Sequence, residues 1–381
     1  MVDLSESRKK IDAIDNQIVD LFKQRMGVAA DVAEFKKANG RQPMDESRER
    51  ALLTRVSEMA GEEFAGYTRR LYSMIMEISR AYQQNIIHPV CEHAINVEKA
   101  LEETPKIFPP LATVACQGVE GAYSQIAATK FFEVPTITYY KTFENVFQAV
   151  ESGECEYGVL PIENSTAGSV KMTYDLMIKY DFSIVKSLRL KVDHNLMVKP
   201  GVKAEDIKEI ISHEQAISQC SEYLKNFPGV KITPVKNTAM AAEMVAKSDR
   251  KDLAALSSRS CAELYGLEML DKSVQDQGNN FTRFICFSKK LEIYPGADRT
   301  SLMMVIDHKP GALYRIMSRF YALGINLLKI ESVPIPERNF EFMFYFDVEA
   351  SVYSPEFRTL LSEFEYQTEE FKYLGTYSEL V

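Results

Sequence analysis

The chain has 381 residues, of which 46% are hydrophobic and 26% are charged, and its formal net charge is −9. This length exceeds one ordinary hydrophobic core, so we expect two or three domains, and the composition excludes a disordered or fibrous protein. The negative charge argues against nonspecific nucleic-acid binding, and it means that an anionic substrate would need a local pocket of Arg and Lys.

Residues 5–87 have a helical pattern throughout, with a long periodic segment, a break at residues 39–43, and two amphipathic stretches on either side of Gly61. The apolar residues of the first segment recur at alternating steps of three and four, which predicts a coiled-coil-like seam. These seam residues are Ile11, Ile14, Ile18, Leu21, Val28, Val32 and Phe35.

Arg25 stands at a seam position where the alternation requires an apolar residue. A buried guanidinium is costly unless an anion meets it, so Arg25 either binds an anionic ligand or pairs with a structural carboxylate. Lys36 lies about three turns further on, roughly 16 Å along the axis, and can flank the same ligand. Arg8 lies ~25 Å before Arg25 on a helix of ~45 Å, which is too long for a small domain. We therefore expect an antiparallel partner chain that brings Arg8 to the same site; the alternative is that Arg8 is a solvated charge.

Two further polar groups share helix faces: Asp45, Arg48 and Glu49 on the second helix, and Ser79 with Gln83 on the third. Together with the three cationic residues, this set resembles the active site of the all-helical chorismate mutase family, over residues 5–87. The resemblance implies a dimer that exchanges helices and a pericyclic rearrangement without a cofactor or metal.

The same resemblance implies a role for each of these residues. The substrate carboxylates would be bound by Arg25, Arg48, Ser79 and Arg8 of the partner subunit. The breaking ether oxygen would face Lys36 and Gln83. The ring hydroxyl would be held by Glu49 and Asp45.

The rest of the chain divides into a linker and two further domains. Residues 91–110 begin after His88-Pro89, end at Pro109-Pro110 and have a charged, weakly helical middle, which is typical of a linker between domains. Residues 111–290 alternate short apolar strands with helices, which predicts an α/β domain of two lobes. Residues 299–381 follow the order strand, helix, strand, strand, helix, strand, which predicts an α+β ferredoxin-like sandwich. We expect Gly311 to open its first helix and Gly324 to close it.

Small polar residues follow the strands of the α/β domain. The segment 118–124 offers backbone N–H groups to an anion, but it lacks the third glycine of a dinucleotide fingerprint and the lysine of a P-loop. The segment 161–169 leads a strand into small polar residues, where open α/β sheets gather functional groups; its alternative is a capped helix start.

These segments, with Ser212-His213, Gln219-Cys220 and Asn280-Phe281-Thr282-Arg283-Phe284, resemble the prephenate dehydratase family over residues 111–290. The resemblance implies an architecture like that of a two-lobed periplasmic solute-binding protein, with the site in the cleft and no cofactor. Thr282 would donate a hydrogen bond to the departing hydroxyl, and Arg283 or nearby N–H groups would neutralise a carboxylate.

The resemblance implies that further residues of the cleft orient the ring, namely Glu163, Asn164, Ser165 and Gln219, and that Phe284 contributes to substrate binding. His213 is either a site residue or a structural histidine. The sequence leaves open whether Thr282, Glu163 or His213 supplies the proton.

In the last domain, Gly311-Ala312-Leu313 starts a helix and Glu331-Ser332-Val333-Pro334 lies on the next strand. This pair of motifs resembles the ACT domain, which in dehydratases of this type binds phenylalanine between two protomers. It implies an effector site at Gly311, Ala312, Leu313, Glu331 and Ser332. Val333 stands where family members commonly have Arg, which removes a charged hydrogen-bonding group from the motif.

The sequence therefore predicts a bifunctional enzyme of phenylalanine biosynthesis that acts on chorismate and prephenate and responds to L-phenylalanine. Two alternatives remain, a metabolite sensor without catalysis and a dehydratase whose helical domain is only a dimerisation arm. We expect a dimer or tetramer with no nucleic-acid partner. We also expect it to lie in the cytoplasm without a membrane partner, because the apolar runs are too short to span a bilayer and no leader precedes the first helix. The six scattered cysteines fit reduced, buried thiols.

Overall fold

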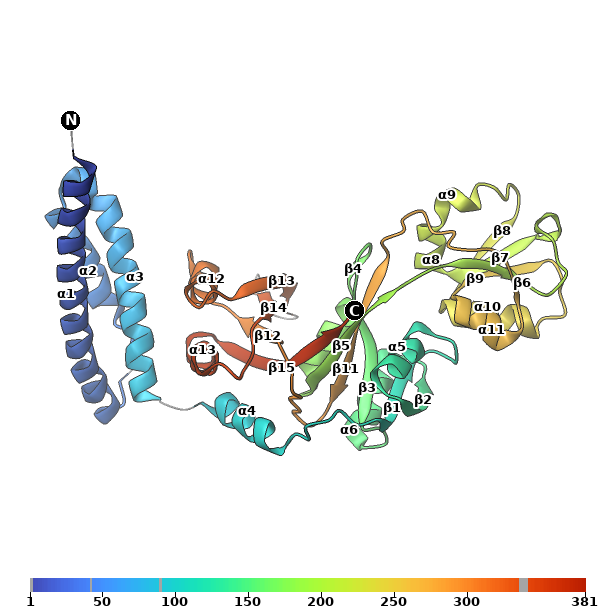
Figure 1. The fold of residues 1–381 in the computed structure, drawn as a ribbon, viewed down its shortest axis with the longest axis horizontal. Coiled ribbons are helices and arrows are strands. Elements are labelled where there is room, and N and C mark those ends of the chain that lie inside the picture. Colours follow the sequence, from blue (N-terminus) through green and yellow to red (C-terminus); the bar gives the residue numbers. More distant parts are fainter. Residues whose placement is uncertain (1–2, 42, 89–90, 336–341) are drawn as a thin grey trace.

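The structure is a computed structural model that describes residues 3–41, 43–88, 91–335 and 342–381. An N-terminal helical domain, a C-terminal sandwich and a two-lobed α/β domain lie in a row, with the sandwich between the other two (Figure 1). No helix in the described ranges combines the length and apolar character needed to cross a bilayer.

Three helices form the N-terminal domain: α1 (Leu4–Ala38), α2 (Glu46–Met59) and α3 (Gly61–Ile87). The side chain of Asp3 caps α1 by accepting from the N–H of Ser5, and Asp45 caps α2 by accepting from the N–H of Arg48. Gly61 begins α3 with a φ of +70°, a conformation that favours glycine. The predicted all-helical pattern, with its break near residues 39–43, is confirmed.

The predicted seam of α1 faces solvent within one chain. Its seven apolar residues are 40 to 64% exposed, whereas Ala29 and Ala33 on the same helix are buried. Helix α1 packs on α3 through its other side (Figure 1). A single chain therefore leaves a long apolar stripe uncovered, which is costly in water.

Residues 91–110, the expected linker, contain the helix α4 (Glu92–Glu103). Its small apolar residues Ala94, Val97 and Ala100 recur every three positions and are buried. This strip packs against α13 (Pro355–Gln367) and the core of the C-terminal domain. The segment is thus a structural part of the sandwich, because three small residues on one face supply a packing surface that its many charges obscure.

The α/β domain has two sheets, one in each lobe. The strands of lobe one are β1 (Leu111–Gln117), β2 (Val134–Tyr140), β3 (Tyr157–Asn164), β4 (Gly168–Ser169), β5 (Ser183–Lys191) and β11 (Phe281–Ser288). Those of lobe two follow the order β10 (Glu268–Asp271), β6 (Asn195–Val198), β9 (Leu253–Ser257), β7 (Glu209–His213) and β8 (Lys231–Val235). The chain crosses between the lobes twice, after β5 and before β11, as expected for two lobes around a cleft (Figure 1).

Short helices cover both sheets. In lobe one they are α5 (Tyr123–Phe131), α6 (Phe143–Ser152) and α7 (Lys171–Lys179). In lobe two they are α8 (Glu214–Gln219), α9 (Ser221–Leu224), α10 (Thr238–Lys247) and α11 (Arg259–Tyr265), with the 3₁₀ turn η1 (Ala204–Asp206).

The C-terminal domain has the predicted ferredoxin-like order. Its elements are β12 (Arg299–Val305), α12 (Ala312–Ala322), β13 (Asn326–Pro334), β14 (Phe342–Glu349), α13 and β15 (Glu370–Leu380), and the strands are ordered β13-β14-β12-β15. Gly311 precedes α12 with a φ of +83°, and Gly324 follows it with a φ of +66°. Both glycines therefore stand at the helix ends where we expected them.

The sheet of this domain continues into lobe one. Residues 378–380 of β15 pair in parallel with residues 186–188 of β5, so one ten-stranded sheet spans both domains. Gly375 makes this approach possible, because a Cβ atom there would lie 2.4 Å from the carbonyl oxygen of Ile184.

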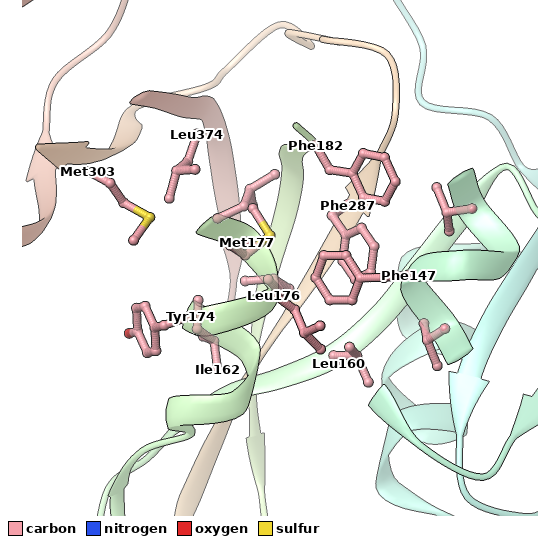
Figure 2. Close-up of a cluster of buried hydrophobic side chains, with 14 of the residues drawn as sticks. Phe147, Leu160, Ile162, Tyr174, Leu176, Met177, Phe182, Phe287, Met303 and Leu374 are labelled. Atoms are coloured by element: carbon pink, nitrogen blue, oxygen red, sulfur yellow. The ribbon is translucent and has the colours of Figure 1, made fainter. Parts of the chain in front are cut away.

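A shared hydrophobic core accompanies the shared sheet. Met303 and Leu374 of the C-terminal strands lie beside Tyr174 and Met177 of α7 (Figure 2). Alternate residues of β12, such as Leu302 and Met304, face the helices of the sandwich instead. Both faces of β12 are buried over residues 302–305, which is why this half of the strand is apolar without interruption.

Candidate functional site

The first candidate site is a pocket of about 460 Å³ between the three N-terminal helices. Seven of the eight residues predicted for this domain line it: Arg25, Lys36, Asp45, Arg48, Glu49, Ser79 and Gln83. Arg8 does not, since it lies exposed near the far end of α1. One chain thus brings together every predicted residue except the one that we expected from a partner.

Hydrogen bonds organise one wall of this pocket. The Nζ atom of Lys36 donates to Oε1 of Gln83 over 3.1 Å and to the carbonyl of Pro43, and Nε2 of Gln83 donates to Oγ of Ser79 over 3.2 Å. Burial lowers the pKa of Lys36, against the opposing effect of the carboxylates of Asp45 and Glu49. The amine and amide that we expected at the ether oxygen are therefore in contact.

The pocket is rich in cations. Five arginines and lysines line it, namely Arg25, Lys36, Arg48, Arg55 and Arg80, against the two acids Asp45 and Glu49. Atom Nη1 of Arg25 is buried without a hydrogen-bond partner. An uncompensated guanidinium in a cation-rich pocket suits a bound anion in a chain that is otherwise acidic.

Arg80 is a site residue that the sequence analysis missed. Its guanidinium forms an ion pair with both carboxylate oxygens of Glu49 and so orients that side chain at the edge of the pocket. Its position directly after Ser79 was a weak signal, because only the fold shows that α3 turns Arg80 towards α2.

The second candidate site is a pocket of about 360 Å³ in the cleft between the lobes. Five of the residues predicted for this domain line it: Asn164, His213, Gln219, Thr282 and Phe284. Ser165 lines an adjoining pocket of about 350 Å³, which Gln219 also borders, and its hydroxyl donates to the carbonyl of Asn279 over 2.8 Å.

Asn164 fixes the hydroxyl of Thr282. Its Oδ1 accepts from the backbone N–H groups of Thr166 and Ala167, so the amide orientation is determined and Nδ2 donates. Nδ2 donates to Oγ1 of Thr282 over 2.9 Å and to Oδ1 of Asn280 over 2.8 Å. Because the oxygen of Thr282 already accepts a hydrogen bond, its own O–H is available to donate into the cleft.

Gln219 connects the two lobes across the cleft. Its Nε2 donates to Oγ1 of Thr166 over 2.8 Å, and its Oε1 accepts from Nδ2 of Asn280 over 2.9 Å and lies 3.0 Å from Nε2 of His194. Burial lowers the pKa of His194, so its imidazole is neutral near pH 7. Gln219 therefore holds α8 of lobe two against the ends of β3 and β11.

His213 has a structural role as well as a place in the pocket. Its Nδ1 accepts from the N–H of Gln215 and caps α8.

A cation that the sequence analysis missed, Lys236, lines the same pocket beside Asn237 and Thr238 at the start of α10. Its place between a strand end and a helix start was a usable signal, because such positions gather functional groups in α/β folds.

The structure corrects the expectations for Arg283 and Glu163, whose side chains lie outside the cleft. Arg283 is 8% exposed and faces the C-terminal domain, where it pairs with Asp347 and with Glu379. Glu163 pairs with Lys329 over 3.2 Å on the same side of the sheet. Successive residues of a strand point to opposite faces, so Asn164 and Thr282 in the cleft place their neighbours on the other side.

In the C-terminal domain, a pocket of about 370 Å³ lies at the start of α12. Ala312 and Leu313 line it next to the turn at Gly311. Ser332 pairs with Phe344, which lines the pocket, so its side chain lies on the same face of the sheet.

Glu331 and Val333 lie on the other face of β13. Glu331 faces lobe one, where its carboxylate meets Lys329 over 3.1 Å and accepts from the hydroxyl of Ser169. Within one chain, Glu331 and the turn at Gly311 do not line the same pocket, so the effector site expected between two protomers stays a prediction. Val333 is buried on the face of Glu331.

Comparisons with known proteins agree with the two sites. Residues 7–84 match the type II chorismate mutase family and residues 114–292 match the prephenate dehydratase family. The bifunctional chorismate mutase/prephenate dehydratase of Escherichia coli K12 is 32% identical, over 97% of this chain and 95% of that protein.

Two solved structures are similar over 70% of this chain. One is a prephenate dehydratase from Arthrobacter aurescens in complex with L-Phe, with a TM-score of 0.64, 26% identity and 89% of that chain covered. The other is described as a novel type of quorum-quenching acylase, with a TM-score of 0.62, 32% identity and 96% of that chain covered. The full-length similarity, with a matching domain at each candidate catalytic pocket, means that the chain belongs to the family of bifunctional chorismate mutase/prephenate dehydratases.

Proposed function

We propose that this chain converts chorismate to prephenate in the helical pocket and prephenate to phenylpyruvate in the cleft. The observation that carries the proposal is the presence of two separate pockets on one chain, one cation-rich and one centred on the Asn164–Thr282 hydrogen bond.

The helical pocket needs no acid, base or metal for a pericyclic rearrangement. Such a reaction is accelerated by holding the reactive conformer and by stabilising the charge that develops on the breaking ether. The buried Nη1 of Arg25 is suited to a substrate carboxylate. Lys36 and Gln83 are in contact and are suited to donate to the ether oxygen.

We infer that this site is completed by a second subunit. The exposed apolar seam of α1 needs a covering surface, and an antiparallel copy of α1 offers an identical one. Helix α1 has 35 residues, or about 52 Å, so Arg8 at one end can reach the pocket of the other chain. Arg8 of the partner subunit would then add the missing cation.

In the cleft, the reaction removes the ring carboxylate as carbon dioxide, and the electron pair left on the ring expels hydroxide from the opposite carbon. Hydroxide departs as water when it takes up a proton. The O–H of Thr282 is free to donate to this leaving group because Asn164 donates to its oxygen. Lys236 and the N-terminal end of α10 are placed to receive a carboxylate.

We propose that the C-terminal domain is an ACT domain that binds L-phenylalanine and inhibits the dehydratase. The ferredoxin-like strand order, the pocket beside Gly311 and the L-Phe complex of the Arthrobacter relative support this assignment. Glu331 lies on the far face of the sheet in one chain, so its contribution to binding would be indirect. We place the enzyme in the cytoplasm, where the six buried thiols would stay reduced.

The acylase activity named for one structural relative is not extended to this chain. Acyl transfer through a covalent intermediate needs a nucleophile activated by a neighbouring base. The hydroxyl of Thr282 is held by the amide of Asn164, which donates a hydrogen bond and does not accept a proton.

The test is to supply chorismate to the purified chain and follow chorismate loss and phenylpyruvate formation separately, each with and without L-phenylalanine. We expect both reactions to proceed and L-phenylalanine to suppress phenylpyruvate formation. Accumulation of prephenate would exclude the dehydratase assignment, and persistence of chorismate would reduce the helical domain to a dimerisation arm.

A further inference from the structure

Strand β11 faces two functional regions at once. Thr282 and Phe284 point into the cleft, and Arg283 between them points to the C-terminal domain. The strand lies inside the ten-stranded sheet between β3 and β5, so it is held on both sides. A shift of Arg283 along or across the sheet therefore shifts the backbone that carries Thr282.

The C-terminal domain supplies the partners of Arg283. Its Nη1 pairs with Asp347 of β14, its Nη2 donates to the hydroxyl of Tyr377 over 2.6 Å, and its Nε lies 3.1 Å from Oε2 of Glu379. The Arg283 side chain is 8% exposed and those of Asp347 and Glu379 are 1% exposed. Hydrogen bonds between charged groups that are buried away from water are strong and depend closely on geometry.

Hydroxyl groups tie this cluster to all three inner strands of the C-terminal sheet. Ser301 of β12 donates to Asp347 and shares a hydrogen bond of 2.6 Å with Tyr377, and the hydroxyl of Tyr345 donates to Ser301 over 3.0 Å. A rearrangement of these strands therefore changes the bonds that hold Arg283.

Strand β3 repeats the arrangement next to β11. Asn164 faces the cleft and bonds Thr282, while Glu163 faces away and pairs with Lys329 of β13. Lys329 also meets Glu331, in the motif that resembles an effector site. Two adjacent strands thus carry cleft residues beside a charged residue that is bound by the C-terminal domain.

We propose that Arg283 is a positioning residue that couples the C-terminal domain to Thr282, an inference that rests on the dehydratase and effector functions proposed above. A rearrangement of β14 or β15 changes the bonds made by its guanidinium, and Arg283 transmits this change to the backbone of β11. The effector then slows dehydration by displacing the hydroxyl of Thr282 from the leaving group, without touching the cleft.

Tyr377→Phe is the sharpest test, because it removes the hydroxyl that accepts from Arg283 and bonds Ser301, and it leaves every buried charge paired. Tyr373→Phe is the matched control. Tyr373 is a buried tyrosine of the same strand whose hydroxyl donates to Thr376 over 2.6 Å, away from Arg283. Arg283→Lys provides a second variant, because it keeps the charge but loses the planar guanidinium that can bond several partners at once.

The first measurement is amide hydrogen exchange over residues 281–284 in full-length protein without ligand. We expect exchange about tenfold faster in Tyr377→Phe and unchanged exchange in Tyr373→Phe, because one strong hydrogen bond is worth about that factor. Equal exchange in the two variants would overturn the proposal, whatever the catalytic activity of the chain.

The second measurement is inhibition of prephenate turnover by saturating L-phenylalanine, with binding of L-phenylalanine followed by calorimetry. Tyr377→Phe and Arg283→Lys should bind the amino acid but lose most of the inhibition, and Tyr373→Phe should be inhibited like the parent chain. Full inhibition in all three variants would contradict the coupling. If the parent chain itself fails to turn over prephenate, the proposed function fails, and the exchange measurement still decides the inference.

Discussion

At the scale of single residues, the proposed dehydratase site centres on one hydroxyl and the amide that orients it. Oγ1 of Thr282 accepts from Asn164 at 2.9 Å, so the donor direction of the threonine is set before substrate arrives. Such preorganised donors act without rearrangement during the reaction.

We predict that Thr282→Val lowers the rate of phenylpyruvate formation from prephenate by about 100-fold to 1,000-fold, because the variant keeps the shape of the side chain but donates nothing. Thr282→Ser keeps the hydroxyl and should retain a substantial part of the rate. Chorismate loss should be the same in both variants. A Val variant that forms phenylpyruvate at the parental rate would remove Thr282 from the mechanism.

Lys36 gives the mutase a distinctive pH dependence. The ether oxygen needs the protonated amine, and burial lowers the pKa of Lys36 from its usual 10.5. The kcat/KM for chorismate should therefore fall as pH rises through the lowered pKa, at a pH below 10.5. Lys36→Arg, which stays charged to higher pH, should not show this fall in whatever activity it retains. A flat profile in the parent chain up to pH 10.5 would contradict the role of Lys36.

Residue-level sequence patterns predicted most of both pockets but not the direction of every side chain. Helical spacing was sufficient to group Arg25 with Lys36 and Ser79 with Gln83, because positions along a regular helix determine which residues share a face, and the family resemblance joined the two groups. Arg283 was misassigned although strand alternation with Thr282 already places it on the opposite face. The pairing of Arg80 with Glu49 joins two helices, and such a contact follows from tertiary packing rather than from local spacing.

At the scale of elements, α1 is the helix whose apolar face is left uncovered in a single chain. Its seam residues are exposed, and the helix is longer than the domain requires. Both features favour pairing with a second copy.

We predict that Ile18→Asp disrupts the dimer and abolishes chorismate turnover, because it places a charge in the seam, and that prephenate turnover survives. Val19→Asp is the control, since Val19 is 50% exposed and lies outside the seam. Sedimentation velocity and the two activity assays would be run on both variants. An Ile18→Asp chain that remains dimeric and active would exclude the seam as the subunit contact.

The junction of β15 with β5 is the second element that can be tested. Gly375→Ala should lower the thermal unfolding midpoint by several degrees, because the new Cβ atom meets the backbone of Ile184 and also strains a φ of +127°. Gly201→Ala has a φ of +81° but open space around it, so it isolates the strain from the steric clash. Equal midpoints for the two variants would mean that the sheets do not approach each other as closely as Gly375 indicates.

The elements themselves were largely predictable, whereas their associations were not. Periodicity located the three N-terminal helices and the order of the ferredoxin-like sandwich, since both depend on local pattern. The pairing of residues 378–380 with β5 joins segments nearly 200 residues apart, and nothing local to either strand specifies it. Helix α4 was taken for a linker because its packing strip consists of small residues among charges.

At the scale of the whole molecule, the sandwich lies between the two catalytic regions and contacts both (Figure 1). Towards the helical domain, Arg319 lies 3.7 Å from Glu77, and the ring of Tyr366 stacks on His88 at 4.5 Å. Towards lobe one it shares a sheet and a core. If the sandwich is the effector domain that we propose, this central position would let it influence both reactions.

A pocket between the sandwich and the helical domain borders a pocket of each domain. A pocket of about 340 Å³ at this junction is lined by Glu49 and Arg80, which also border the mutase pocket. Asp307 and Lys309 line it as well, and both border the pocket beside Gly311. The junction pocket therefore lies between the mutase pocket and the pocket beside Gly311 and shares lining residues with each.

The central claim is that two independent sites on one chain perform consecutive reactions through prephenate. The most direct measurement combines Lys36→Met, which disables the helical pocket, with Thr282→Val, which disables the cleft. We predict that neither variant alone converts chorismate to phenylpyruvate at an appreciable fraction of the parental rate, that Thr282→Val accumulates prephenate, and that a mixture of the two restores phenylpyruvate formation. A Thr282→Val chain that forms phenylpyruvate at the parental rate by itself, or a mixture that forms none while prephenate accumulates, would contradict the account.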